Sequence, residues 1–344
     1  MRMLFWGAAA AASVGLSMPT KGDVFHLPAG QTSLQFVPVG NVGNPANVDG
    51  IGSVSYNYSI GKYEVTQGQY TTFLNAVAKA DPYGLYRTFM EANRGTTDAT
   101  NIQRSGVSGN YSYSVPADYV NRPVTITDWG DAARFANWLT NNQPTGPEGP
   151  STTEDGSYAL NGAITEGALN AVTRKSPAQG GRYYIPTEDE WYKAAYHKND
   201  GITADYWTFA TSSNDKPGRD MSESTNPGNN ANYFSAPFPI DPPHYATPVG
   251  EFELSHSPYG TYDQMGNAWE WTEKIIFGER QVRGGSFAYG WDLEHASDGL
   301  DRFPSTTEYS DIGFRIVFIP VPEPKSLAFG LAVVALLLAR RRSA

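Results

Sequence analysis

The sequence contains no cysteine among its 344 residues. Disulfide bonds, cysteine nucleophiles and thiolate metal ligands are therefore excluded from the whole chain. Basic residues are also scarce, since 25 Lys and Arg stand against 35 Asp and Glu and give a formal net charge of -10. Apart from a cluster at the carboxyl end they are scattered, and they form no patch interleaved with aromatic residues. Nucleic acid is therefore not a predicted partner.

Long hydrophobic runs are absent as well. The run Leu4–Leu16 follows Arg2 and has the length of a secretory signal, so we expect residues 1–23 to be a signal peptide. The second run, Leu327–Ala339, reaches only about 20 Å as a helix, against a hydrocarbon core of about 30 Å. Arg340–Arg342 follow this run. By the positive-inside tendency they would stay cytoplasmic while the body of the chain lies outside.

The motifs of common hydrolases and metal enzymes are also missing. The chain has no G-x-S-x-G nucleophile elbow. Its five histidines include no pair at the i, i+4 spacing of a helical metal site. The acidic run Glu188–Glu190 resembles a set of glycosidase carboxylates, but acids at the start of an expected helix compensate the helix dipole. The sequence therefore predicts no catalytic residue.

The chain is rich in residues of irregular structure and of aromatic cores, with 35 Gly, 24 Pro, 21 Tyr and 8 Trp. Alternation predicts a strand or hairpin in residues 52–66. Helices are expected after Thr66, Thr127 and Thr187, the first and third with T-x-x-Q or T-x-x-E capping boxes. Residues 141–156 and 201–230 read as loops, and residues 312–319 as an alternating strand. This order predicts one mixed α+β domain of helices around an irregular sheet.

Several motifs then occur in one order from Ile60 to Val317: IGKYEVTQGQY, RPVTITDWGDAARFANWL, YYIPTEDEWYKAAY, YGTYDQMGNAWEWTE, VRGGSF and IGFRIV. Together they resemble the formylglycine-generating-enzyme, or sulfatase-modifying-factor, family. The resemblance covers most of the mature chain and places the domain at residues 33–319. It implies the family's variant of the C-type-lectin-like fold, an α+β fold with little regular secondary structure.

The resemblance also implies what is missing. The family's oxidases convert a sulfatase cysteine into formylglycine, with oxygen and a copper ion held by two cysteines. Those cysteines follow the RGGSF-type turn, and by spacing the corresponding positions are near Tyr289 and Glu294. Neither side chain can act as a soft thiolate ligand for Cu(I). We therefore expect no copper.

Calcium is the cofactor that the residues favour. Asp263 and Glu270 are hard oxygen donors with backbone carbonyls between them, which suits a calcium ion of six to eight ligands. The alternative is that both are hydrogen-bonded turn residues. By resemblance, one family calcium site maps onto Asp263, Gly266, Ala268 and Glu270, and the other onto Asn232, Tyr233, Asp241 and Pro243.

The segment after the glycine turn is the candidate ligand surface. Trp269 and Trp271 alternate on one side of an expected strand, where they would either pack in the core or stack on sugar rings. Arg283 and Arg315 are expected to pair with buried carboxylates such as Glu64 or Glu270. The candidate ligand surface itself consists of Ser286, Tyr289, Trp291 and Glu294.

The carboxyl end, residues 320–344, resembles a PEP-CTERM sorting tail, with VPEP, a short apolar run and arginines in that order. The resemblance implies an exosortase-type sorting partner, a transient inner-membrane anchor and the envelope or matrix of a Gram-negative bacterium. The sequence thus predicts an exported lectin-like module that binds a glycan, a peptide or another surface ligand. The alternative is a formylglycine-generating-type oxidoreductase that modifies an exported protein.

Overall fold

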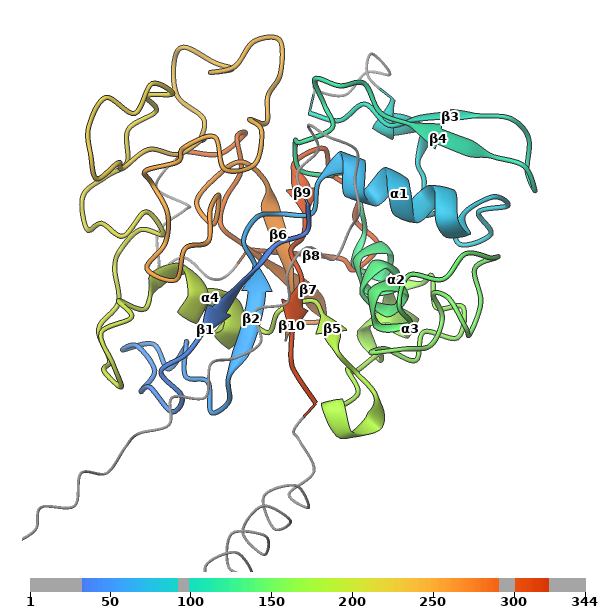
Figure 1. Ribbon diagram of the computed structural model, residues 1–344, viewed down its shortest axis with the longest axis horizontal. Coiled ribbons are helices and arrows are strands. Elements are labelled where there is room, and N and C mark those ends of the chain that lie inside the picture. Colours follow the sequence, from blue (N-terminus) through green and yellow to red (C-terminus); the bar gives the residue numbers. More distant parts are fainter. Residues whose placement is uncertain (1–32, 92–98, 291–300, 322–344) are drawn as a thin grey trace, which may run out of the picture.

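The computed structural model describes residues 33–91, 99–290 and 301–321. Short helices and strands alternate with long irregular segments, as the glycine and proline content predicted (Figure 1). Within these residues no helix is both long enough and apolar enough to cross a membrane. The expected signal peptide and sorting tail lie outside the described residues, apart from Pro320 and Val321.

Two small sheets form the centre of the domain (Figure 1). In the first, the strand order β1-β2-β10-β5 brings the two ends of the domain together, because β10 pairs antiparallel with both β2 and β5. In the second, of order β8-β7-β6-β9, the β6–β7 hairpin is extended by β9 in parallel. A separate hairpin, β3–β4, lies beside α1. The strands are β1 Phe36–Val39, β2 Tyr58–Gly61, β3 Gln103–Ser105, β4 Ser112–Ser114, β5 Tyr183–Tyr184, β6 Trp269–Ile276, β7 Glu279–Arg283, β8 Arg302–Phe303, β9 Ile312–Gly313 and β10 Val317–Phe318.

The four described α-helices begin at side-chain caps, two of which the sequence predicted correctly. Thr66 and Thr187 cap α1 and α4 through capping boxes with Gln69 and Glu190, as predicted. The expected cap at Thr127 is wrong by one residue. Asp128 caps α2 instead. Its carboxylate accepts a hydrogen bond from the N–H of Asp131, and the carboxylate of Asp131 accepts one from the N–H of Asp128. The helices are α1 Gln67–Val77, α2 Trp129–Thr140, α3 Glu166–Asn170 and α4 Glu188–Tyr196, with short 3-10 turns at Thr88–Met90 and Pro177–Gln179.

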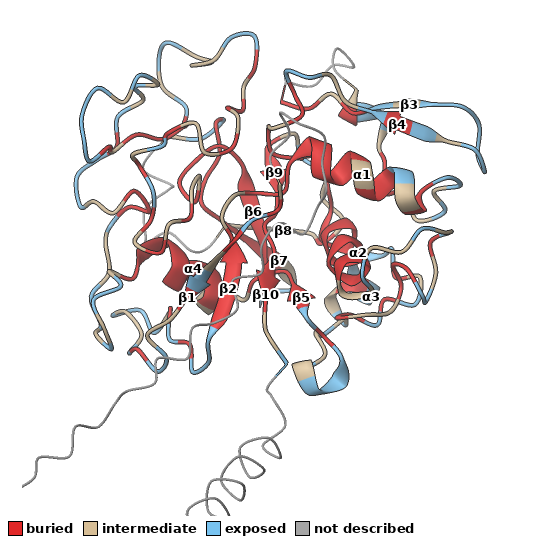
Figure 2. Ribbon diagram, viewed as in Figure 1, coloured by how far each residue is buried: buried red, intermediate tan, exposed pale blue. Residues whose placement is uncertain are grey.

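The hydrophobic core lies between the helices and the two sheets (Figure 2). Aromatic residues dominate it, and Trp129, Trp138, Trp191 and Trp271 are all 2% exposed or less. Trp269 is also buried, so the tryptophans of the WEW motif pack in the core and do not form a sugar-stacking surface. Burial of such large rings supplies much of the free energy of folding in a chain without disulfides.

The expected alternating strand at residues 312–319 is instead two short strands, β9 and β10, in different sheets. All residues from Ile312 to Phe318 are buried, so the chain here has no solvent-facing side. Arg315 lies between the strands and turns into the core, where it meets Glu270. Pairing with a buried acid thus overrides the alternation that predicted a single strand.

Candidate functional site

The β6–β7 hairpin leads into the RGGSF turn, which is built on two glycines. Gly284 and Gly285 have φ angles of 100° and 77°, a region that side chains with a Cβ rarely adopt. A Cβ on Gly284 would also come within 3.2 Å of the Trp191 ring. The carbonyl of Gly284 accepts a 2.7 Å hydrogen bond from the N–H of Gly266. The turn therefore joins β7 to the 263–268 segment.

Two residues of the candidate ligand surface can be placed. Ser286 is fully buried and donates a 2.7 Å hydrogen bond to Asp311 Oδ2, so it stabilises the turn from inside. Tyr289 is 37% exposed, its ring packs edge-on against Trp269, and its carbonyl accepts from the N–H of Phe234. Trp291 and Glu294 lie outside the described residues. Of the four, Tyr289 is the described residue that a ligand can reach.

A cluster of buried acids lies behind this turn. Arg315 donates from Nε and Nη2 to the two carboxylate oxygens of Glu270 at 2.5 and 2.6 Å, and both side chains are fully buried. Trp191 Nε1 donates a further 2.7 Å bond to Glu270 Oε2. The expected pairing of Arg315 with a buried carboxylate is therefore confirmed. Both oxygens of Glu270 are already engaged.

Two more acids share the field of Arg315. Glu64 is fully buried, accepts from Asn267 through Oε1, and has no partner for Oε2 among the described residues. Burial, with Asp263 and Glu270 nearby, raises the pKa of Glu64 well above its usual range. Burial also raises the pKa of Asp263 to about 6, although the N–H of Gly250 donates to its carboxylate at 2.6 Å. The guanidinium of Arg315 thus lies near the three acids Glu64, Asp263 and Glu270.

The fit of this cluster to calcium is partial. Asp263 supplies a hard carboxylate and borders a cavity of about 10 Å³, room for about one water-sized group. Glu270 would have to share its carboxylate with Arg315 and Trp191. No group of three His, Asp or Glu side chains that could hold a metal ion occurs within the described ranges. Main-chain oxygens, such as those of Gly266 and Ala268, would have to complete the shell.

The second predicted calcium set lies around the segment 241–246. Asn232 is buried and donates to the carbonyl of Tyr245, while its Oδ1 has no partner in the described part of the chain. Asp241 forms a 2.7 Å ion pair with Arg122, which competes with a cation for the carboxylate. Tyr233 directs its hydroxyl to the carbonyl of Pro217, and Pro243 follows a cis peptide bond.

Arg283 was expected to pair with a buried carboxylate such as Glu64 or Glu270, and the carboxylate that it meets is that of Glu188. Its Nη2 contacts Glu188 Oε1, and Gln281 Nε2 donates to the same oxygen at 2.6 Å. Arg283 is 2% exposed. The Arg283 guanidinium lowers the pKa of Glu188 against the opposing effect of burial. The general prediction of a buried ion pair holds, and the pair ties the hairpin to the first turn of α4.

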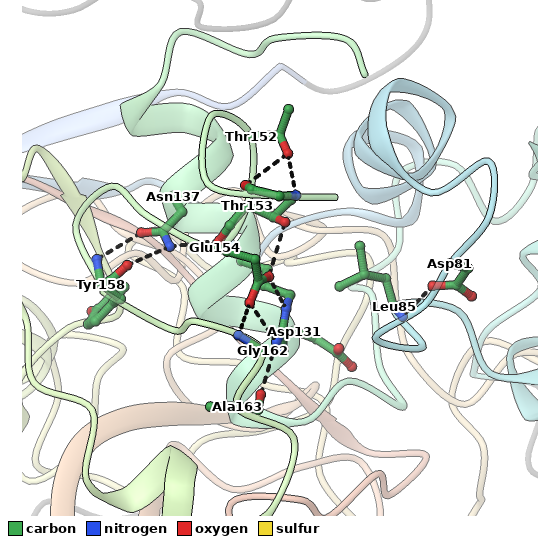
Figure 3. Close-up of polar contacts among 12 residues, drawn as sticks. Asp81, Leu85, Asp131, Asn137, Thr152, Thr153, Glu154, Tyr158, Gly162 and Ala163 are labelled. Atoms are coloured by element: carbon green, nitrogen blue, oxygen red, sulfur yellow. Dashed lines mark hydrogen bonds and ion pairs between the residues drawn. The ribbon is translucent and has the colours of Figure 1, made fainter. Parts of the chain in front are cut away.

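A second polar cluster joins α2 to the loop that follows it (Figure 3). Arg134 donates to both oxygens of Glu154 at 2.7 and 3.2 Å, and Asn137 bonds the backbone of Thr153 and Tyr158. These contacts hold the loop at 141–156 that the sequence predicted. Glu148 in the same loop is 9% exposed, and its carboxylate makes no well-formed hydrogen bond among the described residues, although the backbone N–H of Tyr83 lies near it. Burial, with Asp81 nearby, raises the pKa of Glu148 to about 8.

Sequence reasoning missed a cavity of about 680 Å³ at the end of the first sheet. Tyr56, Arg174, Tyr184 and Pro320 are among its lining residues. They come from segments far apart in the sequence, and no motif links them. Only the tyrosine-rich run SYNYS, which includes Tyr56, gave a signal in the sequence.

The fold and the glycine turn together define a mixed α+β domain of the C-type-lectin-like kind. The Sulfatase-modifying factor enzyme 1-like domain matches residues 23–319. The chain therefore belongs to the sulfatase-modifying-factor family, as its motifs suggested. A comparison with curated proteins gives no match.

Several solved structures are similar to this chain over most of its length. Treponema denticola variable protein 1 has a TM-score of 0.50 at 18% identity, over 86% of this chain and 98% of that one. CarF has a TM-score of 0.48 at 21% identity, over 83% and 98%. PvdO from Pseudomonas aeruginosa has a TM-score of 0.45 at 16% identity, over 84% and 95%. At these identities the first likeness supports the fold alone.

Proposed function

We propose that this chain is an exported recognition module of the sulfatase-modifying-factor family and does not perform the family's copper oxidation. The observation that carries the proposal is the absence of cysteine from all 344 residues. Cu(I) needs soft ligands such as thiolates, and a site that loses its ligand type normally loses its metal. Tyr289, near the first expected cysteine position, offers a phenol packed against Trp269.

Recognition by this module rests on loops held by a rigid frame. Hydrogen bonds to Asp311 and to the 263–268 segment hold the turn at Gly284–Ser286 in place, while Tyr289 stays 37% exposed. Sites of this kind, in which irregular segments carry the contacts and a buried core holds them, are typical of binding proteins. The proposed ligand is an envelope glycan or another surface molecule.

The proposed location is the envelope or matrix of a Gram-negative bacterium. Residues 1–23 would act as the signal peptide, and residues 320–344 as a PEP-CTERM tail that anchors the chain transiently and meets an exosortase-type enzyme. The order of VPEP, Leu327–Ala339 and Arg340–Arg342 supports this proposal. Fractionation of cells that express the tagged chain tests it. Full-length chain in the cell envelope and a variant without residues 320–344 in the medium would support it, whereas cytoplasmic retention of both would contradict it.

Calcium is proposed as a structural ion of this module. Asp263 would be its carboxylate ligand, with carbonyl oxygens of Gly266 and Ala268 beside it and Glu270 shared with Arg315. The raised pKa values of Glu64 and Asp263 reflect three acids around the Arg315 guanidinium, and a further cation here would stabilise their charged forms. The second predicted set, with Asp241 paired to Arg122, is less favourable.

The experiment that tests the function is a glycan array probed with the purified chain, in calcium and in EDTA. We expect selective binding of at least one envelope-type glycan, strengthened by calcium because the ion would order the 263–268 segment behind the turn. Absence of all glycan binding, together with oxygen-dependent oxidation of a cysteine peptide, would contradict the proposal and favour the oxidoreductase.

A further inference from the structure

The cavity of about 680 Å³, here called the sheet-end cavity, is built by the strand order of the first sheet. Because β10 runs antiparallel to both β2 and β5, its end lies beside their beginnings (Figure 1). The residues just before β2, those just after β10 and the segment 174–179 therefore meet at one edge. The volume lies in the range of about 300–1,000 Å³ that holds small ligands.

The basic residues of the sheet-end cavity are already neutralised. Arg174 forms ion pairs with Glu190 and Glu273, each at 3.2 Å, and Lys175 contacts Asp155. Charge-assisted bonds to a phosphate or a carboxylate need a cation that is not paired in this way. The cavity is therefore unsuited to an anionic ligand.

The walls of the cavity are aromatic and apolar. Tyr56 is 36% exposed, and its hydroxyl donates a 2.7 Å hydrogen bond to Glu190, which fixes the ring at the rim. The guanidinium of Arg174 lies 4.9 Å from the centre of the Tyr184 ring and supports the floor. Ile319 and Pro320 complete the apolar side. A ligand with an apolar face can pack against these groups.

Neutral amides lie at the same rim. The exposed side chain of Asn57 makes no hydrogen bond within the residues described here. Gln179 uses its carbonyl oxygen to accept from the N–H and the hydroxyl of Ser176, and its NH₂ group donates to no other described residue. Amides of this kind both donate and accept, as a ligand hydroxyl does.

We infer that the sheet-end cavity binds a neutral saccharide, an inference that rests on the recognition function proposed above and adds the site and the ligand class. A sugar ring has an apolar C–H face for Tyr56. Its hydroxyls can donate to and accept from the amide of Asn57, and they can accept from the NH₂ group of Gln179. The carboxylate of an acidic saccharide would remain uncompensated, because Arg174 and Lys175 are already paired with acids of the chain. A proline-rich peptide would offer carbonyl acceptors only and would leave the amide oxygen of Asn57 without a donor.

The test uses the full-length chain on an array of neutral oligosaccharides (hexose, N-acetylhexosamine and deoxyhexose types), uronic-acid oligosaccharides and octaproline. Titration calorimetry with the strongest neutral oligosaccharide then compares four variants. We expect Tyr56→Ala and Asn57→Ala each to weaken binding about tenfold or more, which corresponds to about 1.4 kcal/mol. Tyr56→Phe keeps the ring, and Phe277→Ala removes an aromatic ring that is 87% exposed and lies outside the cavity, so both should stay within about threefold of wild type.

Asn57→Ala removes a side chain without internal bonds, so its effect is not a folding effect. Binding of only uronates or octaproline, or unchanged affinity in Tyr56→Ala and Asn57→Ala, would overturn the inference. If the saccharide binds but a fifth variant, Tyr289→Ala, abolishes binding while Tyr56→Ala and Asn57→Ala do not, the ligand binds at the glycine turn, the sheet-end cavity is wrong and the recognition function stands. If no saccharide binds and cysteine peptides are oxidised, both fail.

Discussion

Replacement of Arg315 by methionine should strongly destabilise the fold. The change keeps an apolar stem of similar length but leaves Glu270 charged and fully buried, with Trp191 as its remaining polar partner. The carbonyls of Gly61 and Tyr262 also lose donors, at 2.9 and 2.8 Å. Removal of one partner of a buried ion pair costs about 3–5 kcal/mol. Since whole domains are stable by about 5–15 kcal/mol, this is a large fraction of the total.

The assay is equilibrium unfolding in urea, followed by tryptophan fluorescence. The eight tryptophans make the signal strong, and Trp191 reports on the site directly. The double variant Glu270→Gln/Arg315→Met removes the orphaned charge and should recover at least about half of the loss. Glu279→Gln is the matched control, because its pair with Arg302 is partly exposed at 36% and 30% and should contribute less than about 1 kcal/mol. A loss below about 1 kcal/mol in Arg315→Met would refute the reasoning, as would a double variant no more stable than the single one.

Three further results are expected. Glu148→Gln should flatten the pH dependence of stability. The pKa of Glu148 is near 8 in the folded state and 4.5 ordinarily, so wild type should lose up to about 1.4 kcal/mol of stability per pH unit as the pH rises from 4.5 to 8. The same pH dependence of the free energy of unfolding in both proteins would contradict this. Calcium at about 100 times its Kd should stabilise wild type by about 2.7 kcal/mol in thermal unfolding and should leave the stability of Asp263→Ala unchanged. An equal shift in both proteins would exclude Asp263 as a ligand. Gly284→Ala should lower the free energy of unfolding by about 1–3 kcal/mol, because the φ of Gly284 is 100° and the Trp191 ring is close. Gly278→Ala should lower it by less, because Gly278 has a φ of 90° but open space around it. Equal losses in the two variants would show that contact with Trp191 plays no part.

The sequence was sufficient for the scaffold because local chemistry and family motifs agreed. The capping boxes at Thr66 and Thr187 place two helices without any tertiary information. The cap of α2 could not be placed to the residue, since Thr127 and Asp128 are both good caps and only the reciprocal bond with Asp131 decides between them. The alternating pattern at residues 312–319 predicted a single strand wrongly for a similar reason, because Arg315 pairs with the buried carboxylate of Glu270, which is distant in the sequence.

The candidate site was harder to predict because it depends on contacts between distant segments. Tyr56, Asn57, Gln179 and Tyr184 carry no common motif, and only the strand order of the first sheet brings them together. Which acid an arginine will meet was also beyond the sequence: Arg283 meets Glu188 and not the acids near Arg315. Composition, in contrast, bears directly on redox chemistry, since a ligand type that the chain lacks cannot be supplied by folding.

The most direct test of a recognition module without copper chemistry is a copper titration coupled to oxygen consumption. The purified full-length chain is titrated anaerobically with Cu(I) against a chromogenic chelator, then mixed with oxygen and a cysteine-containing sulfatase peptide, with an active formylglycine-generating enzyme as the positive control. We expect no retained Cu(I), no oxygen consumption above that of buffer and no formylglycine in the peptide by mass spectrometry. One equivalent of tightly bound Cu(I) with oxygen-dependent conversion of the cysteine would contradict this expectation.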